Sequence, residues 1–123
     1  MSALSPVILL VSVLAVSHPD LGEAVGPALQ DGRQAFDVDL PSDCTMTGGD
    51  PRMDFEVFLI TCGAVDYAGV YVGNAANESM PRSRLLAAPY QWPSQVQVWS
   101  LQVSADQARA DRIAASVRLR KVN

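Results

Sequence analysis

Alternation of apolar and polar residues with a period of two predicts several β-strands in this chain. In "AFDVDL" (35–40), Phe36, Val38 and Leu40 share one face and two aspartates share the other. This pattern is typical of a strand with one buried face. The segment "MDFEVFLITC" (53–62) has apolar residues at successive positions and acids only near its start. That composition predicts a central strand that becomes buried on both faces.

Two further segments continue the β pattern. "AGVYVGN" (68–74) follows the second strand after the short connection "GAVDY", and this spacing predicts an antiparallel hairpin. "QVQVWSLQV" (95–103) alternates again and predicts another strand. The intervening residues 75–93 are polar and contain prolines, so we expect a loop there, with at most one helical turn. Residues 41–52 combine proline, glycine and aspartate, and this composition predicts a turn region.

The period changes near the C-terminus, where apolar residues recur at helical spacing. Their common face comprises Ala110, Ile113, Ala114 and Val117. Ser104 stands three residues before Gln107, the spacing of a capping box at the start of a helix. "VRLRKV" (117–122) then alternates as a short strand. The predicted fold class is α+β: a small antiparallel sheet packed by a C-terminal helix, after a cleavable N-terminal signal segment.

The N-terminal segment has the pattern of an export signal. "PVILLVSVLAV" (6–16) is an apolar core, and Ala15 and Ser17 supply the small residues that favour cleavage before His18. The alternative is a buried N-terminal strand of a cytosolic protein, whereas a stable membrane span needs about 20 apolar residues. We therefore expect a signal peptide over 1–17, a linker over 18–34, and a single domain over 35–123.

Cys44 and Cys62 are the two cysteines of the chain, and export into an oxidising compartment predicts a disulfide between them. A tight hairpin turning at residues 50 and 51 would place Cys44 opposite a residue several positions short of Cys62. The connecting loop must therefore be wide or skewed toward Met53. Free structural thiols and a reactive thiol are the alternatives, but His18 is the only histidine available as a base or ligand. The sequence predicts no metal site and no cofactor.

Charge is divided along the chain of 123 residues, whose formal net charge is -4. Residues up to Glu78 carry an excess of nine negative charges, and residues from Ser79 onward carry an excess of five positive ones. One interpretation is that the two parts attract each other within the fold. The other is a basic C-terminal surface that contacts an acidic partner, with Arg109 and Arg112 outside the apolar helical face. Nucleic acid is excluded as that partner, because the chain is acidic overall and contains a single lysine.

A second candidate contact surface combines an aromatic turn with arginines. Tyr71 and Asn74, in "YVGN", could line one rim with Arg82 and Arg84, in "RSR", where an arginine would bind a carboxylate and Tyr71 would stack. The alternative is an ordinary turn with solvated arginines. Trp92 lies in a proline-containing segment and is a further contact candidate.

"ADRIAASVRLR", at the C-terminus, resembles the closing helix of small exported bacterial domains with a Mog1/PsbP-like fold. The similarity covers about a dozen residues. It implies architecture only, since domains of this kind bind partners rather than share a chemistry.

We therefore expect a periplasmic or secreted, non-catalytic binding domain, including the possibility of an inhibitor or immunity-type protein, with a protein as its partner. The abundance of alanine and of arginine over lysine suggests a bacterial source. The alternatives are a small hydrolase and a structural component of the envelope. A hydrolase would use paired carboxylates such as Asp37 with Asp39, or Asp54 with Glu56.

Overall fold

The computed structural model describes residues 22–49 and 54–121, and in these ranges the chain forms two antiparallel sheets and one helix. The α+β class is therefore confirmed. The expected signal segment 1–17 and its cleavage point before His18 lie outside the described residues. In chain order the elements are β1 (Glu23–Val25), β2 (Phe36–Leu40), β3 (Cys44–Gly48), β4 (Glu56–Cys62), β5 (Val65–Gly73), β6 (Ser83–Ala87), β7 (Gln95–Ser100), α2 (Gln107–Ala115) and β8 (Arg118–Leu119).

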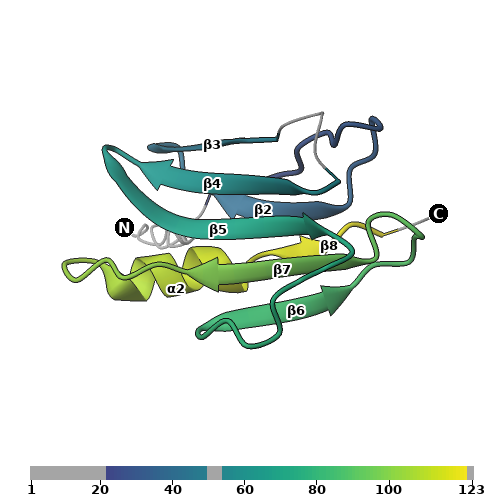
Figure 1. The fold of residues 1–123 in the computed structure, drawn as a ribbon. Helices are drawn as coiled ribbons and strands as arrows, with labels where there is room; N and C mark the ends of the chain where they lie inside the picture. Colours follow the sequence, from purple (N-terminus) through teal and green to yellow (C-terminus); the bar gives the residue numbers. More distant parts are fainter. Residues whose placement is uncertain (1–21, 50–53, 122–123) are drawn as a thin grey trace, which may run out of the picture.

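The larger sheet has the strand order β3-β4-β5-β7-β6, and every neighbouring pair is antiparallel (Figure 1). The predicted hairpin is confirmed as β4 and β5, although β5 begins at Val65 rather than at Ala68. Gly63 and Ala64 form its two-residue turn, and the φ of Gly63 is +65°. A positive φ at the first position of such a turn favours glycine, so this residue type fits the tight reversal.

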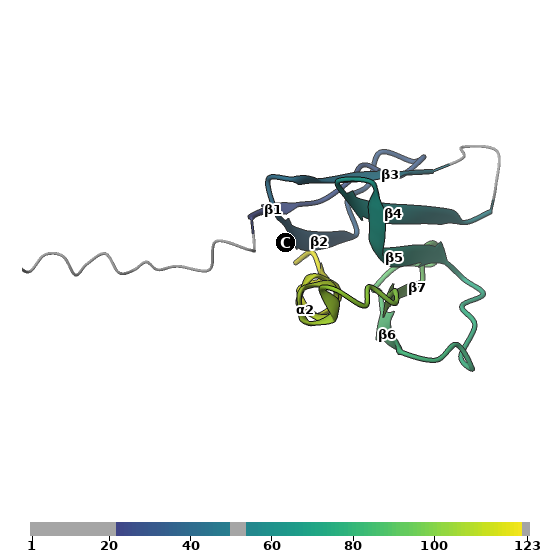
Figure 2. The same cartoon turned by 90° about the vertical axis from the view of Figure 1, so that its left-hand side faces the viewer.

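The smaller sheet has the order β1-β2-β8. Together with α2 it lies on one side of the larger sheet, as Figure 2 shows. The segment 18–34 was expected to be a linker, but its described part contributes β1, which pairs with β2, and the buried Leu29. The fold thus contains two sheets where the sequence predicted one.

The hydrophobic core fills the space between these two layers. Phe36 of β2 contacts Phe58 of β4 edge to face, with ring centroids 5.7 Å apart. The predicted apolar face of the helix is confirmed, since all four of its residues are buried. The remaining core side chains from the large sheet include Ile60, Ala68, Val70, Val72, Val96 and Val98. Burial of these aliphatic side chains supplies the main stabilisation of the fold.

The opposite face of the large sheet is only partly covered. Val57 is 39% exposed, so the prediction that β4 is buried on both faces is wrong. Residues 74–82, between β5 and β6, lie over β7, where the backbone N–H of Asn77 donates to Oε1 of Gln97 at 3.1 Å. Nε2 of Gln97 donates to the carbonyl of Asn77 at 2.7 Å in return, which satisfies the buried amide of Gln97.

Three local expectations were wrong. Residues 75–93 are not only a loop, because β6 lies within them, and the turn region 41–52 contains β3. The capping box does not form: the residue before the helix is Asp106, which makes no side-chain capping bond. Gln107 instead accepts a hydrogen bond from the backbone N–H of Val103 and donates to the carbonyl of Leu101, both at 2.9 Å. The side chain thereby ties the helix to the preceding loop.

Candidate functional site

The predicted disulfide is present. Cys44 of β3 and Cys62 of β4 face each other directly in the strand ladder, with Cα atoms 4.0 Å apart, and their sulfur atoms are bonded. The register centres the connecting loop on Met53, as the sequence argument required. Both cysteines are 6% exposed. The bond therefore joins the edge strand β3 to its neighbour β4 from inside the core.

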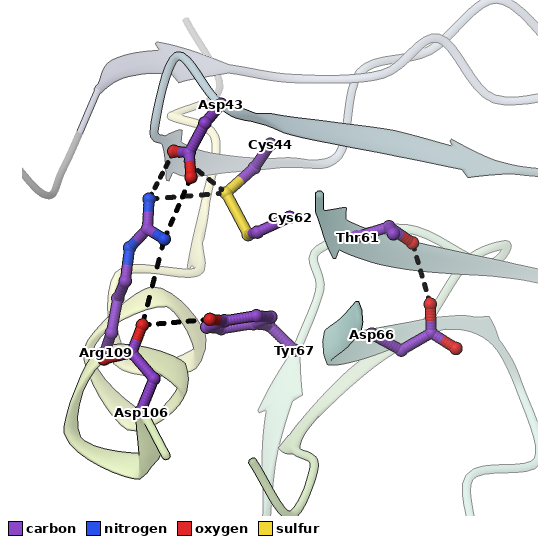
Figure 3. The surroundings of a disulfide bond; sticks show 8 residues. All are labelled: Asp43, Cys44, Thr61, Cys62, Asp66, Tyr67, Asp106 and Arg109. Atoms are coloured by element: carbon purple, nitrogen blue, oxygen red, sulfur yellow. Dashed lines mark hydrogen bonds and ion pairs between the residues drawn. A yellow bond between two sulfur atoms is a disulfide. The ribbon is translucent and has the colours of Figure 1, made fainter. Parts of the chain in front are cut away.

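A charged cluster closes over this disulfide (Figure 3). Arg109 of α2 binds Asp43 through both terminal nitrogens, with Nη1 to Oδ2 at 3.1 Å. Its Nη2 also lies 3.7 Å from Sγ of Cys44. The side chain of Arg109 is 15% exposed, so it is not available to a partner as the basic-surface hypothesis supposed.

Tyr67 and Asp106 complete the cluster. The Tyr67 hydroxyl donates to Oδ2 of Asp106 at 2.9 Å, and the Arg109 guanidinium lies 5.6 Å from the centre of the Tyr67 ring. The hydrogen bond to Asp106 raises the pKa of the Tyr67 hydroxyl above its ordinary value. The hydrogen bonds from Arg109 lower the pKa of the Asp43 carboxyl below its ordinary value of 3.8. These contacts connect the helix, the large sheet and the disulfide. Within the cluster, Arg109 binds Asp43 and Tyr67 binds Asp106.

Other arginines also pair with acids from the first part of the chain. Arg118 contacts Asp39 at 3.1 Å, and Arg120 contacts Asp37 at 2.6 Å. These contacts agree with the interpretation that the acidic and basic parts attract each other within the fold. They also occupy two of the carboxylates that a hydrolase would need.

The arginines expected beside Tyr71 lie elsewhere. Nη2 of Arg84 donates to the carbonyl oxygens of Ala114 at 3.1 Å and Val117 at 2.8 Å, at the C-terminal end of α2. Arg82 is 3.8 Å from Asp111 on an exposed surface. Arg112 lies in the last turn of the helix and is exposed. The structure therefore separates Arg82 and Arg84 from the aromatic turn.

The aromatic candidate Trp92 lies in an open cleft of about 410 Å³. Its lining residues are Asp31, Arg33, Tyr90, Gln91 and Trp92. The Arg33 guanidinium stacks over Tyr90 at 4.1 Å from the ring centre, and Nη1 of Arg33 donates to the Trp92 carbonyl at 2.5 Å. A carboxylate oxygen of Asp31 is 3.7 Å from Nη1 of Arg33. The cleft thus presents two aromatic rings beside one partly neutralised cation.

Tyr71 and Asn74 support the cleft from behind. Nδ2 of Asn74 donates to the Gln91 carbonyl at 3.0 Å, and Oδ1 of Asn74 accepts from the backbone N–H of Ser94 at 2.8 Å. The Tyr71 hydroxyl accepts from the backbone N–H of Ala75 at 2.7 Å. The Asn74 bonds fix the loop that carries Trp92, whereas the Tyr71 bond fixes the residue that follows Asn74. Neither Tyr71 nor Asn74 is among the residues that line the cleft.

Further aromatic contacts hold the same end of the sheet together. Nε1 of Trp92 donates to the carbonyl of Asp54 at 2.7 Å. The next residue, Phe55, stacks on Tyr71 with ring centroids 5.6 Å apart. The Trp92 loop is thus tied to the start of β4 as well as to the end of β5.

Sequence reasoning found Trp92 but missed Arg33 and Tyr90. Tyr90 could have been predicted, because it stands beside Trp92 in the "YQW" segment. Arg33 is 59 residues from Trp92 in the sequence, and no local pattern indicates that the two residues meet. Within residues 22–49 and 54–121, no group of three histidine, cysteine or acidic side chains could hold a metal ion. In the same ranges, no helix has the length and apolar character needed to span a membrane. Comparisons with family models, curated proteins and solved structures find no match to this chain.

Proposed function

We propose that this chain is an exported, non-catalytic module that binds a protein, with inhibitor or immunity-type activity as the specific role. The observation that carries the proposal is the cleft formed by Arg33, Tyr90 and Trp92. Arginine, tyrosine and tryptophan are the residue types that dominate the binding energy of protein interfaces. Here all three meet at one depression that has room for a large side chain of a partner.

The cleft is held in shape before any partner arrives. Trp92 is fixed at its indole nitrogen by Asp54 and at its carbonyl by Arg33. Asn74 holds the neighbouring Gln91 and Ser94. A preformed site loses little conformational entropy on binding, so a shallow contact can still contribute affinity.

The hydrolase alternative receives less support. Asp37 and Asp39 are in ion pairs with arginines, and Glu56 is buried and accepts a hydrogen bond from the backbone of Gln30 at 2.6 Å. General acid or base catalysis needs carboxylates that can reach a substrate. These side chains instead bind parts of the fold. The Mog1/PsbP-like resemblance of the C-terminal helix is consistent with a binding role.

Export is supported by the disulfide and by the apolar segment 6–16. We expect the mature chain to begin near His18 in the periplasm or outside the cell. N-terminal sequencing of protein purified from fractionated native cells measures this. An intact Met1 in the cytosolic fraction would contradict it.

Site-specific photocrosslinking tests the binding role. A photoreactive amino acid replaces the exposed Gln91 in the cleft, and in a matched variant it replaces the exposed Ala64 in the β4–β5 turn, at the opposite end of β5. After irradiation in the native envelope or culture fraction, we expect one discrete adduct from position 91. Replacing Trp92 by Leu in the same variant should remove it. Equal adducts at both positions, or none at position 91, would overturn the proposal.

A further inference from the structure

Strand β6 forms one margin of the large sheet and pairs on one side only, with β7 (Figure 1). In a strand, backbone N–H and C=O groups point alternately to both sides, so the outer side of β6 presents groups that no neighbouring strand of the described chain satisfies. Such an edge is a template for a further strand. Five consecutive residues, Ser83 to Ala87, are in regular register with β7, without a bulge.

Strand β6 lacks two common protections of a sheet edge. Folded proteins often block an edge with proline or lysine, and β6 contains neither residue. The sequence of β6 is "SRLLA", and its one charged residue, Arg84, is engaged with the carbonyl groups at the end of α2. Leu85 is 41% exposed on the partly covered face of the sheet. The strand therefore combines an open edge with an apolar side chain that gains from being covered.

We propose that β6 pairs with β6 of a second copy of this chain, antiparallel and around a two-fold axis at Leu85. This register uses all five residues of the strand. It places Leu85 opposite Leu85, Arg84 opposite Leu86, and Ser83 opposite Ala87. A shift that centres the pair on Arg84 would bring two like charges together, and a shift that centres it on Leu86 would lose part of the ladder.

Self-complementarity favours a second copy over a foreign strand. In a two-fold dimer the same surface of each copy contacts the other, so that surface must be complementary to itself. Two antiparallel "SRLLA" strands centred on Leu85 meet this condition, because no like charges face each other. The two sheets would join into one, and the paired Leu85 side chains would shield each other from water. A contact of five residues per chain is small, so the dimer is a reversible one that forms at high protein concentration. The strand is separate from the cleft around Trp92, and this inference does not depend on the proposed function.

Charge substitution at the axis provides the test. Leu85→Lys and Leu85→Glu each place two like charges against each other, so each variant should sediment as a monomer at concentrations where the wild type is dimeric. Because Leu85 is exposed, both variants should keep the melting temperature of the wild-type monomer. An equimolar mixture of the two should dimerise again, because Lys then faces Glu. A wild-type chain that stays monomeric, or a mixture that does not recover the dimer, would overturn the proposal.

Disulfide trapping tests the register. Leu85→Cys should form a covalent dimer by itself under mild oxidation. Ser83→Cys should not, but a mixture of Ser83→Cys with Ala87→Cys chains should. Thr47→Cys, exposed on the other edge strand β3, serves as the matched control. If Thr47→Cys crosslinks as fast as Leu85→Cys, or if Ser83→Cys alone crosslinks best, the proposed pairing is wrong.

Discussion

Arg109 of the helix binds Asp43, which lies 66 residues earlier in the chain and precedes the disulfide-bonded Cys44. Nη1 of Arg109 donates to Oδ2 of Asp43 at 3.1 Å, and Nη2 bonds the second carboxylate oxygen. This fork-to-fork contact fixes both the distance and the orientation of the two groups. It joins α2 to the strand edge at the position where the disulfide already holds β3 to β4.

Arg109→Gln should lower the stability of the fold and leave association with a partner unchanged. The side chain is largely buried, but the Asp43 carboxylate is 59% exposed, so solvent screening keeps the loss of stability small. Thermal denaturation measures this loss. In a double-mutant cycle with Asp43→Asn, the double variant should lose less free energy of unfolding than the sum of the two single variants. Each single substitution already removes the same Arg109–Asp43 interaction. Additive losses would show that the pair is not coupled.

Acid should remove the contribution of Asp43 in a defined pH window. The pKa of its carboxyl is lower in the folded chain than the ordinary 3.8, because it accepts hydrogen bonds from Arg109. Its stabilisation is therefore complete above pH 3.8 and is lost as the pH falls through the folded pKa. The melting temperatures of wild type and Asp43→Asn should differ at neutral pH and should converge only as the pH falls below 3.8 and through the folded pKa of Asp43. A difference that persists at low pH would contradict this assignment.

The sequence predicted those strands and the helix that bury one face. Burial of one face leaves a regular repeat of apolar residues in the sequence. Phe36 and Val38 alternate with polar aspartates, and Ile113 and Ala114 repeat at helical spacing. The second sheet was not predictable, because β8 pairs with β2 between residues as distant as Phe36 and Leu119. No local pattern carries that information.

Besides β1, the sequence missed β3 and β6, which are the two edges of the large sheet. β3 alternates threonine with cysteine and methionine and ends in glycine, so its composition resembles a turn region. In β6 the core side carries Arg84 as well as Leu86. The charged group of Arg84 reaches the end of α2, so the strand lacks a clear apolar face in the sequence. Edge strands contact one neighbour rather than two, and burial therefore constrains their side chains less.

The candidate site was predictable only in part for a similar reason. Trp92 was recognisable because a tryptophan beside proline in a polar segment is a common contact residue. Its partner Arg33 comes from a segment that the sequence assigned to a linker. The charge division predicted attraction between the parts of the chain, but the individual pairs, such as Arg118 with Asp39, depend on the register of distant strands.

The disulfide should contribute about 3 kcal/mol, because it closes a loop with a sequence separation of 18 residues. The double variant Cys44→Ala, Cys62→Ala should unfold at lower denaturant concentration, with the spectrum of the folded state retained. Since both cysteines are buried, reduction of the wild type should be slow without denaturant. Mass spectrometry after alkylation, with and without a reductant, measures both properties. Two alkylated thiols in unreduced native protein would show that the bond is absent in solution.

Arg84 and Arg82 are two residues apart, yet their replacement should have different effects on stability. Arg84 donates to the carbonyl oxygen of Ala114, in the last turn of α2, and to that of Val117, just beyond its end. Carbonyl groups at the end of a helix have few helical N–H partners. A cation at this end also interacts favourably with the helix dipole. Arg84→Met keeps the aliphatic stem but removes these hydrogen bonds, so it should cost about 1 kcal/mol.

Arg82 provides the matched control for that substitution. Its contact with Asp111 is 3.8 Å long, and both side chains are largely exposed. An exposed ion pair of this kind contributes little, so Arg82→Met should change the free energy of unfolding by less than about 0.5 kcal/mol. Hydrogen exchange at the last turn of α2 separates the two variants further, since Arg84→Met alone should speed exchange there. If both variants are equally stable and exchange equally fast, Arg84 does not hold the end of the helix.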